Sequence, residues 1–280
     1  MELVNDNNDI QHPVINALIN NEGLHRGDYS NTGFEVYHFS DMPAFRGLGS
    51  SSAFAVGLLN AWGGLYHPHQ DKEQLAVEAI MLEQMDLKEN VGCQDQWLCA
   101  LGGVNYLRFP AGRFGGVSPH VEKLSGPGNT DTIAKLSQYI MLVDTKTMRV
   151  ASYIASTQID EMPKHEDDML KMVSLAEQGK CLLEEGDLDE FAKLLHESWQ
   201  IKKSLSPKIT FPEAEHIYDL ARKHGALGGK VIGAGGGGYF LLLAEPDTHK
   251  AIKEALEGYK CIDNIGFDYE GATVIYKDGG

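Results

Sequence analysis

Apolar positions along the chain recur mostly with helical spacing, and a few short stretches have the pattern of strands. Apolar residues three and four apart predict one face of an amphipathic helix, whereas alternation or a short unbroken apolar run predicts a strand. The predicted helices span residues 9–20, 50–62, 72–85, 166–184, 187–204, 212–224 and 247–257. The predicted strands span residues 34–39, 101–109, 117–124, 140–143, 239–244, 261–268 and 272–276. This mixture indicates an α+β protein.

Some of the predicted boundaries carry their own signals. Asp71 is followed three residues later by Gln74, which resembles a capping box at the start of a helix. Gly186 separates two helical patterns and predicts an antiparallel helix pair. The stretch 110–130 is rich in Gly and Pro and carries little periodicity, so we place a domain boundary near its end. The predicted domains are residues 1–128 and 129–280.

The charge balance limits the classes of partner. The chain of 280 residues has 24 Lys and Arg against 40 Asp and Glu, a formal net charge of −16. Nucleic acids and anionic membranes attract basic surfaces, so we expect neither as a partner. A phosphorylated small molecule would have to be held by helix dipoles, a metal ion and a few placed cations against this overall field.

The cysteines, the first residues and the length of the apolar runs indicate the cellular compartment. The four cysteines, at positions 93, 99, 181 and 261, have no C-x-x-C pairing and no metal-ligand spacing, which suits a reducing cytosol. The first residues are acidic and polar, unlike a signal peptide. No apolar run approaches the ~18 residues that a membrane span requires. The sequence therefore predicts a soluble, cytoplasmic protein.

A glycine-rich loop directly precedes the helix predicted at 50–62, within residues 43–52 (Pro-Ala-Phe-Arg-Gly-Leu-Gly-Ser-Ser-Ser). Gly47 and Gly49 permit backbone angles and close approach that a side chain would forbid. The free N–H groups and dipole of a helix N-terminus attract phosphate, and a serine there can reach a phosphate-bound magnesium. Serine is also a common helix cap, and no Gly-Lys-Ser/Thr closes a Walker A loop, so a purely structural role stays open.

A second glycine tract spans residues 230–239 (Lys-Val-Ile-Gly-Ala-Gly-Gly-Gly-Gly-Tyr). Its glycines satisfy G-x-G-x-x-G, but a dinucleotide fingerprint requires a helix after the loop. The following residues, 239–244, read as a strand, so we reject a nicotinamide-dependent enzyme. Close packing of the backbone against a ligand or another loop explains the four consecutive glycines better than a simple turn.

Two acidic residues have unusual positions. Glu83 falls on the apolar face of the helix predicted at 72–85, where a carboxylate is costly unless it is paired or bound to metal. Rotation of that helix could instead bring Glu83 to solvent. Asp95 lies in a Gly-containing turn after this helix, where an Asp commonly serves as a cap.

Taken in order, these motifs resemble the GHMP small-molecule kinases over essentially the whole chain. The matching parts are the loop 43–52, Glu83, Gly92-Cys-Gln-Asp95 and the tract 230–238. Within that family, the sequence is most similar to the D-glycero-D-manno-heptose 7-phosphate kinases, through residues 12–14, 41–44, 94–96 and 196–199.

The resemblance implies a two-domain fold, with an incomplete N-terminal domain like ribosomal protein S5 domain 2 and a ferredoxin-like C-terminal domain. It implies an ATP- and Mg²⁺-dependent kinase that phosphorylates a sugar or sugar phosphate, most similar to enzymes acting on the anomeric hydroxyl of D-glycero-D-manno-heptose 7-phosphate. Ser51 and Glu83 would hold Mg²⁺, and Asp95 would act on the acceptor hydroxyl. The residues implied to bind the ATP phosphates are Gly47, Leu48, Gly49, Ser50, Ser51, Ser52, Gly235 and Gly236. The oligomeric state is left open, with a homodimer among the options.

The chain also departs from the family pattern. Members usually carry a strand with a motif such as Arg-Thr-Pro-Leu-Arg-Ile-Ser well before the phosphate loop, which here begins at residue 47. We therefore expect either a fragment or a degenerate, non-catalytic homologue that binds nucleotide or a partner. Cys93 stands where close relatives often have Lys. Arg46, Lys202 and Lys203 could face phosphate groups, but solvated positions are the preferred expectation for all three.

Overall fold

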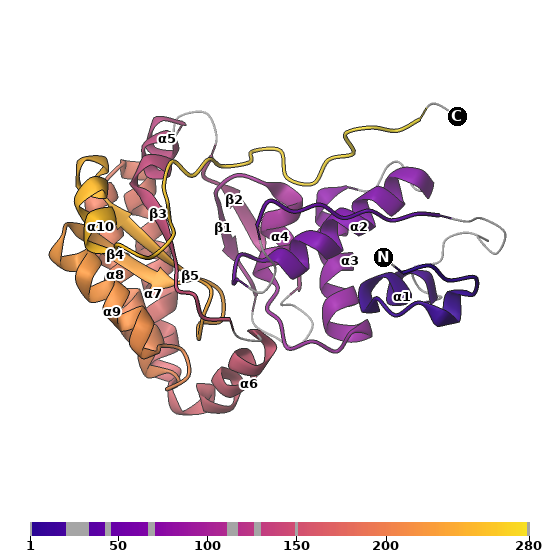
Figure 1. Ribbon diagram of the computed structural model, residues 1–280, viewed down its shortest axis with the longest axis horizontal. Coiled ribbons are helices and arrows are strands. Elements are labelled where there is room, and N and C mark those ends of the chain that lie inside the picture. Colours follow the sequence, from indigo (N-terminus) through magenta and orange to yellow (C-terminus); the bar gives the residue numbers. More distant parts are fainter. Residues whose placement is uncertain are drawn as a thin grey trace.

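The computed structural model describes residues 2–20, 34–42, 46–66, 71–110, 117–125, 130–148 and 151–278. The described chain forms an elongated molecule with a sheet-containing half built from later residues and a mainly helical half built from earlier ones (Figure 1). The C-terminal segment returns from the sheet-containing half and runs across the helical half (Figure 1). No helix in the described ranges combines the length and the apolar character that crossing a bilayer requires.

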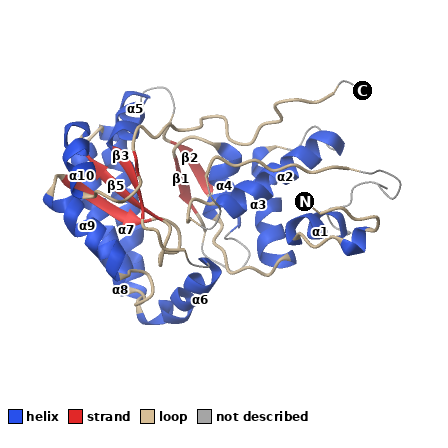
Figure 2. Ribbon diagram, viewed as in Figure 1, coloured by secondary structure: helices blue, strands red, loops and turns tan. Residues whose placement is uncertain are grey.

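The second half is organised around a four-stranded antiparallel sheet of order β4-β5-β3-β6 (Figure 2). Its strands are β3 (Ile140–Asp144), β4 (Ala226–Val231), β5 (Tyr239–Ala244) and β6 (Cys261–Ile262). Its helices are α5 (Thr130–Tyr139), α6 (Ala151–Glu161), α7 (Glu166–Glu185), α8 (Leu188–Ser204), α9 (Pro212–Lys223) and α10 (His249–Ala255). Short 3₁₀ turns occupy Met162–Lys164 and Pro246–Thr248.

The two central strands are apolar on both faces because each face of the sheet is covered. Phe240 and Leu242 of β5 join a core that includes Trp199 of α8 and Ile217 of α9. Their neighbour Leu243 faces the other way, into a core shared with α5 and the start of α8. Alternate strand residues point to opposite faces, so two covered faces require an unbroken apolar run.

The first half packs its helices around a separate apolar core. Its elements are a 3₁₀ turn (Asn7–Asp9), α1 (Pro13–Asn20), α2 (Ser50–Tyr66), α3 (Lys72–Met81), a π-helical turn (Leu82–Asp86) and α4 (Gln94–Leu101). The two-stranded antiparallel sheet of β1 (Asn105–Arg108) and β2 (His120–Lys123) follows α4. Trp97 and Leu82, which are almost completely buried, sit in the core shared by these helices.

Several predicted boundaries are confirmed. The helices predicted at 50–62, 166–184, 187–204 and 212–224 and the strand predicted at 239–244 are present with small shifts at their ends. Asp71 caps α3, with its side chain accepting a hydrogen bond from the Gln74 N–H at 2.7 Å. Gly186 ends α7 in the left-handed region at φ 81°. The helix predicted at 9–20 begins only at Pro13, because the residue before a proline disfavours helical angles.

The strands predicted at 34–39 and 272–276 are wrong. Both segments are extended, but neither belongs to a ladder with another described strand. The segment 34–39 instead lies across α2, where the Phe34 ring meets Trp62 edge-on at 5.6 Å. Segment 272–276 crosses the helical half, where Val274 contacts Gly64. The strand predicted at 261–268 shortens to Cys261–Ile262.

The helices α4, α5 and α6 and strand β4 were not predicted from the sequence. The predicted domain boundary at 128/129 falls within residues 126–129, which lie outside the described residues. That boundary stays a prediction.

Candidate active site

The phosphate-loop candidate forms a tight turn into α2, with Gly47 at φ 76° and Gly49 at φ 68°. The Gly49 carbonyl accepts the Ala53 N–H at 2.9 Å, so α2 grows directly out of the loop. A Cβ at Gly47 would come within 2.8 Å of the Ile232 carbonyl oxygen. Glycine is therefore required there by positive φ and by close packing together. Residues 43–45 of the predicted motif lie outside the described residues.

Glu83 is completely buried, which settles its orientation toward the interior. The π-helical turn after α3 carries Glu83, and its two carboxylate oxygens accept three side-chain hydrogen bonds. Ser51 Oγ donates to Oε1 at 2.7 Å, Ser52 Oγ donates to Oε2 at 2.8 Å, and Gln96 Nε2 donates to Oε2 at 2.6 Å. A buried carboxylate with three donors is compensated, and it ties the start of α2 to α4.

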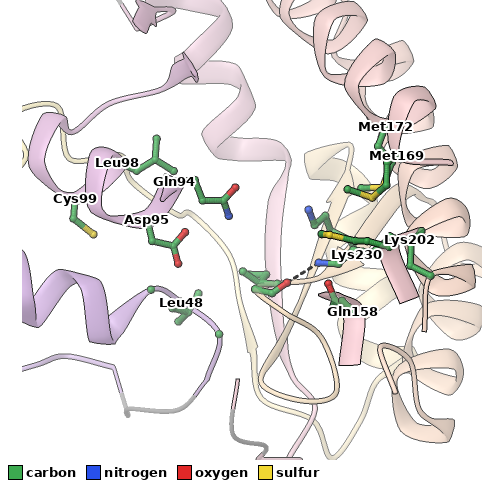
Figure 3. A pocket seen from close by; sticks show the side chains of 16 residues that line it. Leu48, Gln94, Asp95, Leu98, Cys99, Gln158, Met169, Met172, Lys202 and Lys230 are labelled. Atoms are coloured by element: carbon green, nitrogen blue, oxygen red, sulfur yellow. Dashed lines mark hydrogen bonds between the residues drawn. The ribbon is translucent and has the colours of Figure 1, made fainter. Parts of the chain in front are cut away.

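Asp95 occupies the first turn of α4 and is not its cap, because Cys93 holds that position. A Cβ on Gly49 would lie 3.4 Å from Asp95 Oδ2, so the carboxylate sits directly beside the loop. Asp95 and the loop residues Gly47, Leu48 and Gly49 line a cavity of about 530 Å³ between the two halves (Figure 3).

The wall facing Asp95 is cationic and partly apolar. Lys202 of α8 and Lys230 of β4 point into the cavity there, beside Met169 and Met172 of α7 (Figure 3). Lys202 Nζ donates to the Gly233 carbonyl at 2.6 Å. Burial and the neighbouring Lys230 charge lower the pKa of Lys202 to about 7, and burial also lowers the pKa of Lys230. The expectation of a solvated Lys202 is therefore wrong.

The second glycine tract packs against the first at its two ends. A Cβ on Gly233 would lie 3.1 Å from the Gly47 carbonyl oxygen, and one on Gly238 would overlap the Arg46 carbonyl. Gly235 and Gly236 lie at positive φ and pack against the turn at residues 208–209 instead, with Gly236 N–H donating to Ile209 at 2.8 Å. Their predicted contact with ATP phosphates stays a prediction.

Two other basic residues, Arg46 and Lys203, form ion pairs with carboxylates. Arg46 Nη1 lies 2.8 Å from Asp144 Oδ1, and both side chains are largely buried, so the solvated position expected for Arg46 is wrong. Lys203 Nζ pairs with Glu215 at 3.1 Å. Cys99 also lines the cavity, but burial, with Asp95 and Glu83 nearby, raises the pKa of its thiol to about 11, which keeps it unreactive at neutral pH.

Sequence reasoning missed the contributions of Lys230, Gln96 and Gln158. Gln96 follows Asp95 directly, and nothing in the local pattern shows that it reaches Glu83. Gln158 Nε2 donates to the Ala234 carbonyl at 2.5 Å, so α6 supports the second glycine tract. Lys230 stands directly before the tract, and its position was the one available signal.

The Ser51–Glu83 contact has the donor chemistry of a Mg²⁺ site. Magnesium prefers oxygen ligands and commonly takes one or two protein groups with water and substrate phosphates. Ser51 Oγ and Glu83 Oε1 are two such oxygens 2.7 Å apart at the helix N-terminus. In the described parts of the chain, no group of three or more His, Cys, Asp or Glu is arranged to hold a metal.

Comparison with known families gives two matches. The GHMP kinases N-terminal domain model matches residues 13–103, and the GHMP kinases C-terminal model matches residues 180–261. Together the matches span more than half of the chain and include the phosphate loop, Glu83, Asp95 and both cavity lysines.

Individual proteins agree with these matches. The chain is 28% identical over 246 residues to D-glycero-alpha-D-manno-heptose 7-phosphate kinase of Campylobacter jejuni, covering 85% of this chain and 69% of that protein. It is 31% identical over 225 residues to L-fucokinase/L-fucose-1-P guanylyltransferase of Bacteroides fragilis, covering 79% of this chain but 23% of that protein. The crystal structure of a D-glycero-D-manno-heptose 1-phosphate kinase from Bacteriodes thetaiotaomicron superposes with a TM-score of 0.63 at 24% identity, covering 95% of this chain and 74% of that one.

The fold and the site define this protein as a small-molecule kinase, built from an N-terminal and a C-terminal family domain. The chain belongs to the GHMP kinase family. Its relatives include proteins named as kinases of a sugar, a sugar phosphate and mevalonate.

Proposed function

We propose that this chain is an ATP-dependent sugar kinase that phosphorylates the anomeric hydroxyl of D-glycero-D-manno-heptose 7-phosphate. The observation that carries the proposal is the cavity in which Asp95 lies beside the phosphate loop at Gly49. The similarity to the heptose 7-phosphate kinase of Campylobacter jejuni supports this acceptor.

Asp95 is the proposed catalytic residue. The acceptor hydroxyl oxygen attacks the γ-phosphorus, the bond from the γ-phosphorus to the β,γ-bridging oxygen breaks, and ADP leaves with that electron pair. Asp95 accepts or orients the hydroxyl proton as the new phosphate ester forms. The N–H groups at the start of α2 and the loop Gly47, Leu48, Gly49, Ser50, Ser51 and Ser52 hold the ATP phosphates in this proposal.

Mg²⁺ is the proposed metal, and Ser51 and Glu83 would hold it. When bound, it would neutralise charge on the β- and γ-phosphates. Glu83 serves a second purpose, because its hydrogen bonds to Ser52 and Gln96 fix the N-terminus of α2 against α4. That bracing positions Asp95, which directly precedes Gln96.

A non-catalytic binding protein is the alternative. The observation that favours it is the set of large apolar side chains on extended, unpaired segments: Tyr37, Phe39 and Ile275 are 69%, 88% and 95% exposed. This alternative predicts binding of nucleotide or a partner without turnover.

The test is ADP release from ATP and Mg²⁺ by the purified chain, with heptose 7-phosphate, galactose, fucose and mannose as acceptors. We expect turnover with heptose 7-phosphate and a fall of about 10²-fold or more in kcat for Asp95→Asn, since a general base contributes on that order. Nucleotide affinity of Asp95→Asn, followed by fluorescence of a labelled ATP analogue, is expected to stay unchanged.

Asp131→Asn is the matched control, because Asp131 is also a first-turn aspartate but is exposed at the start of α5. It is expected to keep full activity. An Asp95→Asn variant with near-normal kcat would refute the role of Asp95. A folded wild-type chain that binds nucleotide but never releases ADP would favour the non-catalytic alternative.

A further inference from the structure

The cavity wall opposite Asp95 concentrates positive charge in a strongly acidic protein. Of the described residues that line the cavity, Lys202 and Lys230 are the two cations and Asp95 is the one carboxylate. The chain as a whole carries a net charge of −16. The two ammonium groups therefore make this half-buried wall positive, although the protein as a whole is negative.

Neither ammonium group is neutralised by a carboxylate. Within the described chain, neither lysine forms an ion pair within 4.0 Å, and Lys230 has no hydrogen-bond partner, while Lys202 donates to the neutral Gly233 carbonyl. Lys203, the next residue on α8, differs because it is paired with Glu215. Buried charges are costly unless paired, so an anion bound between the two cavity lysines would stabilise their charged forms.

We propose that Lys202 and Lys230 together bind a phosphate dianion on the cavity wall opposite Asp95. This inference rests on the proposed function, and it deepens it by assigning the phosphate-recognising residues. The phosphate monoester of a phosphorylated acceptor and the γ-phosphate of ATP share the chemistry that two ammonium groups recognise.

A phosphorylated acceptor can span the cavity from Asp95 to the two lysines. An acceptor held with its reacting hydroxyl at Asp95 has its far end across the cavity, where Lys202 and Lys230 lie (Figure 3). The apolar side chains of Met169 and Met172 line the same wall, leaving the two ammonium groups as its charged contacts. Such a wall selects a sugar that carries phosphate over the same sugar without it.

A protonation effect accompanies this binding. Free Lys202 has a pKa of about 7, set by burial and by Lys230, with Asp95 acting in the opposite direction. A bound dianion favours the charged ammonium, so binding above pH 7 takes up a proton. Sugar phosphates lose their second proton near pH ~6. Affinity is therefore expected to be highest between about pH 6 and 7 and to fall as pH rises further.

The experiment is isothermal titration calorimetry of the full chain at pH 7 with four probes: heptose 7-phosphate, unphosphorylated heptose, a non-hydrolysable ATP analogue with Mg²⁺, and inorganic phosphate. Lys202→Met and Lys230→Met are each expected to weaken heptose 7-phosphate binding about ten- to hundredfold, the effect of losing a charge-assisted hydrogen bond. Both variants are expected to leave the weaker binding of unphosphorylated heptose unchanged. Lys203→Met is the matched control and is expected to bind like wild type.

The two phosphate sources give different patterns. Loss of affinity for heptose 7-phosphate with intact ATP-analogue binding assigns the lysines to the acceptor phosphate. Loss confined to the ATP analogue assigns them to the γ-phosphate. Unchanged affinity for every phosphate-bearing probe in both variants would overturn the proposal. None of these binding results requires turnover, so failure of kinase activity alone leaves the test intact.

Proton uptake gives a second measurement. Titration of wild type with heptose 7-phosphate at pH 8 in buffers of different ionisation enthalpy is expected to show proton uptake that is smaller in Lys202→Arg, because an arginine stays charged and Lys230 alone is left to take up a proton. Equal proton uptake in the two proteins would contradict the role of Lys202. Thermal unfolding of each variant verifies that it is folded.

Discussion

Glu83 and Lys202 show two different ways in which a buried charge is accommodated. Glu83 is fully buried, yet three donors from α2 and α4 satisfy its carboxylate. Lys202 has one neutral partner and a like charge beside it, so its proton is bound weakly. Hydrogen-bond donors offset the cost of burying Glu83, whereas burial and a like charge destabilise the charged form of Lys202.

The lowered pKa of Lys202 predicts how stability depends on pH. The pKa is about 7 in the folded protein and near 10.5 when unfolded, so between these values the unfolded state holds a proton that the folded state lacks. Stability therefore rises with pH through this window, by at most about 1.4 kcal/mol per pH unit for one group. Urea unfolding at pH 7, 8 and 9 is expected to give a shallower rise for Lys202→Met than for wild type.

Lys203→Met provides the reference for that experiment and is expected to keep the wild-type slope. Parallel stability curves for wild type and Lys202→Met would show that Lys202 stays protonated in the folded protein. Comparing each variant with wild type at the same pH removes the contributions of the other titrating groups.

At the scale of elements, the contact between α8 and β4 sets where the cavity lysines lie. Gly228 of β4 lies so close to α8 that a Cβ would overlap the Ala192 carbonyl oxygen. Lys202 lies on the same helix and Lys230 on the same strand. The glycine lets the helix and strand backbones approach closely, and both lysines then reach one cavity.

Gly228→Ala is expected to destabilise the protein by about 3 kcal/mol or more, at the upper end of overpacking costs, because backbone rather than a flexible side chain must move. Urea unfolding measures this loss. Gly266→Ala is the control, since a Cβ there meets nothing within 4 Å, and it is expected to be nearly neutral. A stable Gly228→Ala variant would mean that α8 shifts on the sheet at little cost.

At the scale of the whole molecule, the phosphate loop joins the two halves. Arg46 forms an ion pair with Asp144 at the end of β3, its carbonyl accepts the Tyr239 N–H at 3.2 Å, and Gly47 packs on Gly233. These contacts link residues about a hundred positions or more apart in sequence. They hold the two glycine tracts together where both line the cavity.

A double-mutant cycle of Arg46→Met and Asp144→Asn, followed by urea unfolding, is expected to show a coupling energy of about 1–3 kcal/mol. The two side chains are only 17% and 16% exposed, so water screens their attraction weakly. The exposed pair Lys171–Glu197, at 2.8 Å, is the matched control and is expected to couple by less than about 1 kcal/mol. Equal coupling in the two pairs would show that burial does not strengthen the loop contact.

Prediction from sequence succeeded for elements with strong local signals. The helices α8 and α9 and the strand β5 have clear apolar patterns, and Asp71 and Gly186 mark helix ends through local hydrogen bonding and backbone angles. Strand β4 was missed because Gly228 and Gly229 are poor strand formers. Segment 34–39 was assigned as a strand because alternation does not reveal whether a neighbouring strand is present.

The sequence by itself determined the two glycine loops, the main helices and the family resemblance, because these depend on residues close together in the chain. Only the tertiary structure decided that Glu83 is buried, that Arg46 is paired with Asp144, and that Lys202 and Lys230 share a cavity wall with Asp95 opposite. Each of these depends on packing between segments far apart in sequence. Burial and pairing of a charge are set by that packing; the helical pattern placed Glu83 on an apolar face but left exposure to solvent open.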